Sequence, residues 1–267
     1  MNKPAEQWGG GAAYETYMGR WSSLIAPVFA EWLGVASGSK WLDVGCGTGV
    51  LSSAIIAAAQ PASVKGLDPS EGFVRFARQE VRDERASFST GDAEDLPEES
   101  ASYDAVVSGL VLNFVGDPST AIAEFRRVAR PGGTVAAYVW DYADKMELTR
   151  YFWDAAAAVD ASGAGLDEGA RFPICHPEPL RASFAGAGLD TVDVRSIDAF
   201  SVFPSFDDYW SPFLGQQGAA PAYLAGLSED ARARVRARLQ DIIPVQPDGH
   251  IRLMLRAWAV KGRRPAD

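Results

Sequence analysis

Apolar and polar positions alternate in two different ways between Lys40 and Trp140. Short apolar runs of strand character are KWLDV, SVKGL, ASFST, YDAVVSG and TVAAYVW. Between them, VLSSAIIAAA, SEGFVRFARQEVRD and PSTAIAEFRRVA carry apolar residues at helical spacing. In the second helical pattern, Ser70 is the expected N-cap residue. This alternation predicts a parallel sheet covered by helices on both faces, with ligands bound at the carboxyl ends of its strands.

The pattern changes after Trp140. We expect a helix from about Met146 to Asp160, a helix over PEPLRASFAGAG, a long strand over LDTVDVRSIDAFSVF and a final strand over IRLMLRAWAV. A mostly helical stretch separates the last two strands, and insertions of this length between paired strands are usually functional. We therefore predict four parts: an N-terminal helical lid segment (1–36), a core (37–203), a helical cap insertion (204–249), and a final core strand with a tail (250–267).

Composition and charge exclude some classes of protein. The chain has 267 residues, which allows one large domain with a modest cap. A net charge of −10 gives a surface that repels phosphate backbones, so we expect no nucleic-acid partner. The densest basic run, ARARVRAR, falls on a helical pattern with Ala231, Val235, Leu239 and Ile242 facing inward. Its arginines are therefore expected on a solvated face.

Other sequence features bear on location and on metals. Two cysteines, Cys46 and Cys175, make neither a disulfide framework nor a metal cluster, so no metal is expected. The first residues lack a secretory pattern, and no run approaches the ~18 apolar residues of a membrane span. We expect a cytoplasmic protein without a membrane partner, present as a monomer or homodimer.

The segment WLDVGCGTGVL places Gly45, Gly47 and Gly49 directly after a predicted strand that carries Asp43. A dinucleotide-binding loop requires glycine where Val50 stands. The compressed spacing suits a ligand without a pyrophosphate. The alternative is a tight strand-to-helix turn that binds nothing.

Two acids follow the next two strands. Asp68, before Pro69, can accept hydrogen bonds from the two hydroxyls of a ribose, or it is an ordinary turn residue. Asp92 can accept from the exocyclic amine of adenine, while the neighbouring Ala93 offers a backbone N–H to a ring nitrogen. The alternative for this pair is also a turn.

Five ordered segments carry a resemblance to a known family. WLDVGCGTGVL, LDPS, GDAEDLP, YDAVVSGLVLNFVGDP and RRVARPGGTVAAYVW resemble the motifs of the class I S-adenosylmethionine-dependent methyltransferases, in particular the small-molecule group similar to ubiquinone/menaquinone-biosynthesis methyltransferases. The resemblance covers about Tyr17 to Tyr142. It implies an α/β, Rossmann-like seven-stranded sheet flanked by helices, with its last strand antiparallel. The sequence pattern adds a helical lid inserted between the last two strands. The resemblance also implies S-adenosyl-L-methionine as cofactor and S-adenosyl-L-homocysteine as product.

The resemblance assigns cofactor contacts residue by residue. In the core it implies Asp43, Gly45, Gly47, Gly49, Asp68, Pro69, Asp92, Ala93 and Ser108. The carbonyl of Ser108 would face the methionine amine. In the N-terminal segment, Tyr17, Arg20 and Trp21 would close over the cofactor, with Arg20 pairing with its carboxylate. The alternative for this segment is an amphipathic helix that docks on the core.

The implied reaction is transfer of a methyl group by in-line displacement to an O, N or C atom. The aromatic run FSVFPSFDDYWSPFLG suggests a small, aromatic or apolar acceptor, although such runs are also ordinary core. The catalytic residues are unknown, and the weak candidates are Asn113, Asp141 and Tyr142. Histidine is frequent in the family where Asn113 stands, which weakens any assignment of a base there. A non-catalytic cofactor-binding protein of the same fold is the alternative function.

Overall fold

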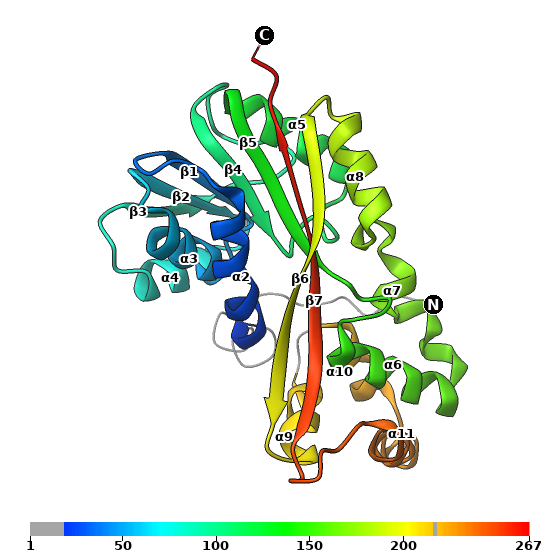
Figure 1. Cartoon of the computed structure of the whole chain (residues 1–267). Helices are drawn as coiled ribbons and strands as arrows, with labels where there is room; N and C mark the ends of the chain where they lie inside the picture. The colour runs from blue at the N-terminus through cyan, green and yellow to red at the C-terminus, as the bar shows by residue number, and fades with distance from the viewer. Residues whose placement is uncertain (1–18, 216–217, 267) are drawn as a thin grey trace. The chain divides into compact units, whose positions relative to one another are not determined.

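The computed structural model describes residues 19–215 and 218–266. Within these residues the strands form a seven-stranded sheet in the order β3-β2-β1-β4-β5-β7-β6 (Figure 1). The strands are β1 Lys40–Val44, β2 Ser63–Asp68, β3 Ala86–Thr90, β4 Tyr103–Gly109, β5 Ala129–Trp140, β6 Asp190–Phe203 and β7 Ile251–Arg263. Strands β1 to β5 pair in parallel, whereas β7 pairs with β5 in the antiparallel sense. The predicted fold class is confirmed.

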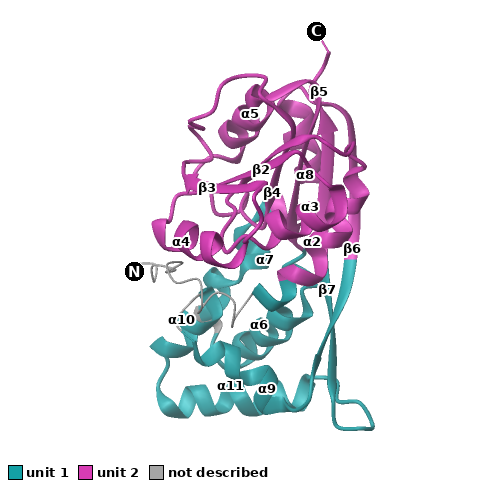
Figure 2. Cartoon of the chain, turned by 90° about the vertical axis from the view of Figure 1, so that its left-hand side faces the viewer, with its two compact units in different colours: residues 1–21, 141–173, 198–256 teal, residues 22–140, 174–197, 257–267 magenta. Residues whose placement is uncertain are grey.

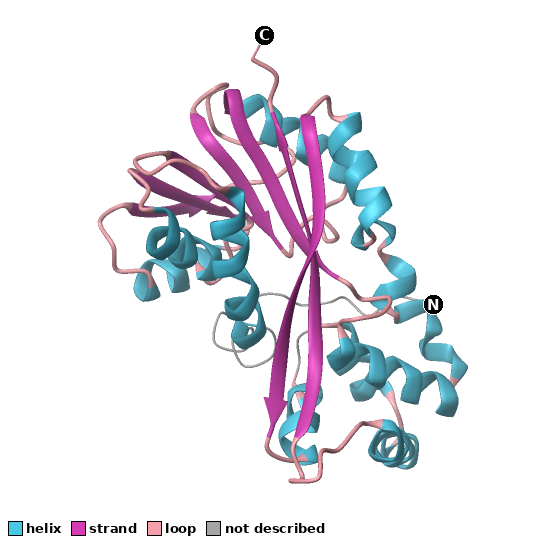
Figure 3. Ribbon diagram, viewed as in Figure 1, coloured by secondary structure: helices cyan, strands magenta, loops and turns pink. Residues whose placement is uncertain are grey.

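Helices connect these strands (Figure 3). The α-helices are α2 Arg20–Leu33, α3 Val50–Ala59, α4 Glu71–Glu80, α5 Pro118–Val128, α6 Glu147–Val159, α7 Glu168–Arg171, α8 Pro177–Gly186, α9 Phe206–Trp210, α10 Ala219–Gly226 and α11 Glu229–Ile242. Short 3₁₀ turns are η2 Ala161–Leu166, η3 Pro173–Cys175 and η4 Ser211–Leu214. Local sequence sets where several of them begin. Ser70 caps α4 by accepting from the backbone N–H of Phe73, as predicted, and Asp117 caps α5 ahead of Pro118. In the described part of the chain, no helix combines the length and the apolar character needed to cross a membrane.

The structure departs from the predicted pattern at β5. The strand begins at Ala129, although TVAAYVW predicted a start at Thr134. Its pairing with β4 shifts register, with Ala129 opposite Tyr103 and Thr134 opposite Ala105. The RPGG segment, with one proline and two glycines, is therefore an irregularity inside the strand.

A second departure concerns α11. Val235 and Leu239 are fully buried, as predicted. Ile243 completes the apolar stripe by lying 5% exposed, whereas Ile242 is only half-buried. The apolar stripe therefore ends one residue later than predicted. The helix stops at Ile242, and the C-cap residue, Ile243, is the one that is buried.

The chain divides into two compact units (Figure 2). Unit 1 comprises residues 1–21, 141–173 and 198–256, and unit 2 comprises residues 22–140, 174–197 and 257–267. Unit 2 contains the glycine loop, Asp68 at the end of β2 and Asp92 after β3. Unit 1 contains the helical segment between β6 and β7. The four-part division made from the sequence stays a prediction.

Aromatic side chains build the core of unit 1. Phe152 stacks on Phe213 with ring centroids 4.7 Å apart, and Tyr209 meets Phe203 edge-on at 5.4 Å. The hydroxyl of Tyr209 donates to the carbonyl of Leu148 at 2.9 Å. All four aromatic rings are fully buried. For Phe203, Tyr209 and Phe213 the structure thus favours the core alternative over exposure to a ligand.

Candidate functional site

The loop between β1 and α3 has a backbone that other residues rarely adopt. Gly45, Gly47 and Gly49 have φ values of +73°, +52° and +89°. Glycine reaches this left-handed region without the penalty that a Cβ brings. The backbone N–H groups of Gly45 and Cys46 both donate to the carbonyl of Leu67, at 2.7 and 2.9 Å. The loop is therefore fastened to the end of β2 by main-chain bonds.

The three glycines serve different steric purposes. A Cβ at Gly45 would lie 2.3 Å from Cγ2 of Val111, and one at Gly49 would lie 2.7 Å from Cγ2 of Val81. At Gly47 no described atom lies within 4 Å of the added Cβ. Gly45 and Gly49 thus leave room for neighbouring side chains. Gly47 alone presents bare backbone to open space, which is what a closely bound ligand requires.

Asp68 braces this loop from the end of β2. Its Oδ2 accepts from the N–H of Gly47 at 3.0 Å, and its Oδ1 accepts from the N–H of Ser70 at 2.9 Å. Each carboxylate oxygen can accept a further hydrogen bond, so the side chain still fits a ribose diol. Burial raises the pKa of Asp68, against the two N–H donors that lower it. The next residue, Pro69, is exposed.

Asp43 is fully buried beneath the same loop. Its Oδ2 accepts from the hydroxyl of Ser52 at 2.7 Å, while its Oδ1 has no partner among the described residues. Burial raises the pKa of Asp43 to about 7, and the nearby charge of Asp68 adds to the rise. Because Oδ1 is buried as well as unpartnered, Asp43 supports the loop from beneath and does not face solvent.

Ser108 joins β4 to β1 at the same level of the sheet. Its hydroxyl donates to the carbonyl of Val44 at 2.8 Å, and the side chain is buried. The hydroxyl is thus occupied by the protein itself. The role implied for the carbonyl of Ser108 stays a prediction.

The acid that follows β3 lies in an irregular segment. Oδ1 of Asp92 accepts from the N–H of Glu94 at 2.9 Å, and the carbonyl of Asp92 accepts from the N–H of Asp95 at 3.4 Å. Asp92 is exposed, whereas Ala93 is buried. The contacts of the Asp92 side chain within the described chain use Oδ1, which leaves Oδ2 for an exocyclic amine. This arrangement fits adenine.

The start of α2 contacts β6 and α9 within unit 1. The guanidinium of Arg20 lies 4.9 Å from the ring centroids of both Trp21 and Phe203, and its Nη2 is 3.8 Å from Oδ2 of Asp208. The indole N–H of Trp21 donates to the hydroxyl of Ser201 at 2.9 Å. These contacts are those of a docked helix. The cofactor roles of Arg20 and Trp21 stay predictions, and Tyr17 lies outside the described residues.

The three weak catalytic candidates lie in different units. Asn113 follows β4 in unit 2, is 8% exposed, and has an Nδ2 without a partner in the described chain. Nearby Leu110 has φ of +63°, a strained value for a branched residue. Asp141 and Tyr142 begin a segment of unit 1 and are both buried, with the Tyr142 ring 6.1 Å from that of Phe172. Their catalytic roles stay predictions.

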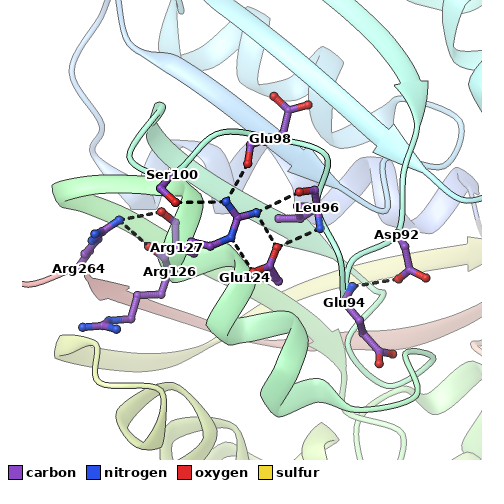
Figure 4. Close-up of polar contacts among 9 residues, drawn as sticks. All are labelled: Asp92, Glu94, Leu96, Glu98, Ser100, Glu124, Arg126, Arg127 and Arg264. Atoms are coloured by element: carbon purple, nitrogen blue, oxygen red, sulfur yellow. Dashed lines mark hydrogen bonds and ion pairs between the residues drawn. The ribbon is translucent and has the colours of Figure 1, made fainter.

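Sequence reasoning missed the residues that hold the Asp92 segment. Glu124 and Arg127 bond to its backbone (Figure 4). The side chain of Glu94 bonds to the turn that starts α5. Nothing next to Asp92 in the sequence signals α5 as the partner, because the bond from Arg127 to Leu96 spans 31 positions. Within the described residues, no group of three or more His, Cys, Asp and Glu side chains is arranged to hold a metal ion.

Comparison with known proteins agrees with this geometry. A family model described as a methyltransferase domain matches residues 42–137. Methyltransferase GfsG from Streptomyces halstedii is 32% identical over 200 residues, which cover 71% of this chain and 68% of that protein. The chain belongs to the class I S-adenosylmethionine-dependent methyltransferases. The cofactor of this methyltransferase is S-adenosyl-L-methionine, and its product is S-adenosyl-L-homocysteine.

Two further matches are informative about this methyltransferase. Demethylmenaquinone methyltransferase from Staphylococcus aureus is 39% identical over 105 residues, which are 39% of this chain and 44% of that relative. The match therefore spans less than half of the relative. Phosphoethanolamine N-methyltransferase 2 from Haemonchus contortus, solved with phosphomonomethylethanolamine and S-adenosylhomocysteine, has 17% sequence identity and a TM-score of 0.58. The aligned region covers 96% of this chain and 57% of that chain, and the likeness shows the shared fold.

Proposed function

We propose that this methyltransferase transfers the methyl group to an O, N or C atom of a small aromatic or apolar molecule. The observation that carries the cofactor side is the open backbone at Gly47, braced by the Asp68 carboxylate. On the acceptor side, Phe114 is 42% exposed beside the buried amide of Asn113. The net charge of −10 opposes a polyanionic acceptor. Two similar proteins carry the names of small molecules, demethylmenaquinone and phosphoethanolamine.

The chain's part in the reaction is to bind and align. When bound, the cofactor supplies an electrophilic methyl group on a sulfonium. After transfer of the methyl group, the sulfur remains as a neutral thioether. Asp68 would hold the ribose, Asp92 and Ala93 the adenine, and the carbonyl of Ser108 the amino group, while Asp43 would shape the glycine loop from beneath. Fixing the cofactor in this way removes orientational freedom before the displacement, which can supply much of the rate. Excluding water from the reacting atoms adds to this effect.

A general base is needed only when the acceptor must lose a proton. The amide of Asn113 cannot take up a proton, so its proposed role is to donate a hydrogen bond from Nδ2 to the acceptor. Asp141 and Tyr142 are proposed as acid/base groups. We further expect a cytoplasmic protein that acts as a monomer or homodimer.

Transfer of labelled methyl groups tests this proposal. The protein is incubated with S-adenosylmethionine tritiated on the methyl group and with panels of phenols, quinols, amines, unfolded protein and RNA. We expect label in an apolar small molecule and none in the macromolecules. The Asp68→Ala variant is the control and should transfer nothing. Label found only in protein or RNA contradicts the small acceptor, and tight S-adenosylhomocysteine binding without any transfer supports the non-catalytic alternative.

A further inference from the structure

The segment between β3 and β4 carries the proposed adenine contacts but has little regular structure. Its one ordered feature within the described chain is an isolated bridge between Asp92 and Asp95. A segment without ladder or helix bonds keeps its shape only when other groups satisfy and fix its backbone. The position of Asp92 therefore depends on what fixes the residues that follow it.

All three guanidinium nitrogens of Arg127 on α5 donate hydrogen bonds, and two of them, Nη1 and Nη2, reach this segment (Figure 4). Its Nε and Nη2 donate to the two carboxylate oxygens of Glu124, at 2.7 and 2.6 Å. Nη2 also donates to the carbonyl of Leu96 at 3.0 Å. Nη1 donates to the carbonyl of Glu98 at 2.8 Å and to the hydroxyl of Ser100 at 3.3 Å. One side chain thus holds three positions of the segment.

Glu124 bonds to the same residue of the segment, Leu96. Its Oε2 accepts from the N–H of Leu96 at 3.0 Å, so both polar groups of Leu96 bond to the Glu124–Arg127 pair. The guanidinium of Arg127 lowers the pKa of Glu124, and the carboxylate in turn raises the pKa of Arg127. The pair therefore stays charged at neutral pH, and charge-assisted bonds of this kind are the stronger ones.

A second contact lies closer to Asp92. Oε1 of Glu94 accepts from the N–H of Gly116 at 2.6 Å and from the N–H of Asp117 at 3.1 Å. Asp117 is the N-cap residue of α5, so Glu94 ties the segment to the start of that helix. The other end of α5 is held by Arg264, whose Nη1 donates to the carbonyls of Arg127 and Ala129, each at 2.7 Å. The helix that anchors the segment is itself fixed at both ends.

We propose that Arg127, Glu124 and Glu94 are positioning residues for adenine recognition. They hold residues 92–100 in the shape that presents the carboxylate of Asp92 and the N–H of Ala93 to the adenine ring. The inference rests on the proposed assignment of Asp92 and Ala93 to adenine. It adds that α5 contributes to the selectivity of the site for its base by fixing the segment that carries Asp92 and Ala93.

Selectivity for the base shows whether Arg127 positions the adenine contacts or only stabilises the fold. Leu96 is 3% exposed and anchors the segment to the core by its side chain, so loss of the Arg127 bonds should loosen the segment without unfolding unit 2. A loosened segment loses the contacts that distinguish adenine. A general loss of stability would instead weaken the binding of any nucleoside to the same degree.

Calorimetric titration with two ligands provides the test. S-inosylhomocysteine differs from S-adenosylhomocysteine at the base, where an oxygen replaces the amine and N1 carries a hydrogen. The wild-type protein should prefer the adenine compound by about 10- to 100-fold, because two hydrogen bonds are lost. In Arg127→Gln this preference should fall at least tenfold, while affinity for the inosine compound changes by less than about threefold. Glu94→Ala should act in the same direction and carries the test if Arg127→Gln does not fold.

Arg85→Gln is the matched control. Arg85 grips the carboxylate of Asp83 through Nε and Nη2 at 2.9 and 2.8 Å, and its side chain is 36% exposed, against 34% for Arg127. It lies just before β3, at the opposite end of that strand from Asp92. This variant should keep the wild-type preference. In a double-mutant cycle, Arg127→Gln should add little to the loss already caused by Asp92→Ala.

The outcomes separate the two proposals. A wild-type preference that persists in both Arg127→Gln and Glu94→Ala overturns the inference and leaves the function intact. An equal loss of preference in Arg85→Gln also overturns it, because the effect would then be general. A wild-type protein that binds both compounds equally refutes the adenine assignment and the inference with it. A wild-type protein that binds neither compound refutes the proposed function itself.

Discussion

The glycine loop and the Asp92 segment lie in the same unit and are assigned to the same cofactor, yet they are held in different ways. The glycine loop is fastened by main-chain bonds from Gly45 and Cys46 to Leu67 and by side chains that fill the space its glycines leave. The Asp92 segment is fastened by charged side chains, chiefly Glu124 and Arg127 of α5. One depends on steric fit and the other on ion-pair geometry.

This difference has a consequence for how each loop responds to change. A steric fit between buried groups fails abruptly when an atom is added, because interiors are close-packed. A partly exposed ion pair contributes less to stability and can loosen while the fold remains. We therefore expect substitutions in the glycine loop to act on both folding and binding. Substitutions on α5 should act mainly on recognition.

Asp68→Ala should have the largest effect, because its carboxylate is the charged group that braces the glycine loop. The variant loses the assigned bonds to two ribose hydroxyls, which are worth about 3–6 kcal/mol together for a charged acceptor. Affinity for S-adenosylhomocysteine should fall by more than about a hundredfold. Calorimetric titration measures this loss directly.

The fold should survive that change at reduced stability. Removing the carboxylate leaves the N–H groups of Gly47 and Ser70 without their present partner, at a cost of about 1–3 kcal/mol each if they stay dry. Circular dichroism and a cooperative thermal transition would show that unit 2 remains folded. Tight cofactor binding retained by a folded Asp68→Ala protein would refute the ribose assignment.

The elements near the glycine loop could be predicted because their signals are local. The apolar run and the glycines define β1 and the turn within a few positions, and Ser70 lies next to the helix that it caps. The start of β5 could not be predicted in the same way. Its register shift against β4 depends on pairing with Tyr103 and Ala105, about thirty positions earlier, which no local pattern reveals.

In the candidate site, too, features with local sequence signals could be predicted and features that depend on distant residues could not. Asp43 and Asp68 lie at the ends of β1 and β2 and Asp92 follows β3, so their shared edge of the sheet could be predicted from the order of elements. The unpartnered Oδ1 of Asp43 and the separate roles of the three glycines could not, because they depend on which side chains fill the space around them. The grip of α5 on the Asp92 segment likewise joins residues that are far apart in the sequence.

Alanine at two of the glycines should sharpen the contrast between steric fit and ligand space. In Gly45→Ala, the new Cβ meets Val111 at 2.3 Å and the backbone keeps an unfavourable φ, so the free energy of unfolding should fall by about 2–4 kcal/mol. In Gly47→Ala, only the φ penalty applies, about 1–2 kcal/mol. Urea unfolding of both variants measures the difference.

Affinity for S-adenosylhomocysteine tests a different property of Gly47→Ala from its stability. The Cβ at Gly47 enters the open space assigned to the cofactor, so S-adenosylhomocysteine affinity should fall at least tenfold although the protein stays folded. Gly132→Ala is a control, since it combines a φ of +75° with open space away from the acids. It should lose similar stability to Gly47→Ala and keep its affinity. Equal binding by Gly47→Ala and Gly132→Ala would contradict the assignment of that space.

The smallest expected effect is a difference in pH dependence between the two loops. Burial raises the pKa of Asp43 from 3.8 to about 7, so the folded state retains a proton that the unfolded chain has lost between these values. The stabilisation of the folded state by protonated Asp43 is therefore fully present below about pH 4 and is lost as the pH rises towards 7. Glu124 behaves in the opposite way, because Arg127 lowers its folded pKa from 4.5. Its contribution is present above about pH 4.5 and is lost as the pH falls through the folded value.

Two variants isolate these opposite slopes in urea unfolding from pH 3 to pH 8. Asp43→Asn keeps an oxygen that accepts from the hydroxyl of Ser52 but cannot ionise. Between pH 4 and pH 7 the wild type should therefore lose roughly 1–3 kcal/mol of unfolding free energy relative to this variant. Glu124→Gln should differ from the wild type by less than about 1 kcal/mol, because the pair is partly exposed, and the difference should shrink as the pH falls below 4.5. A difference between Asp43→Asn and the wild type that does not change with pH would show that Asp43 is already charged in the folded protein. The glycine loop would then rest on a buried ion, and the contrast between the two loops would be one of degree.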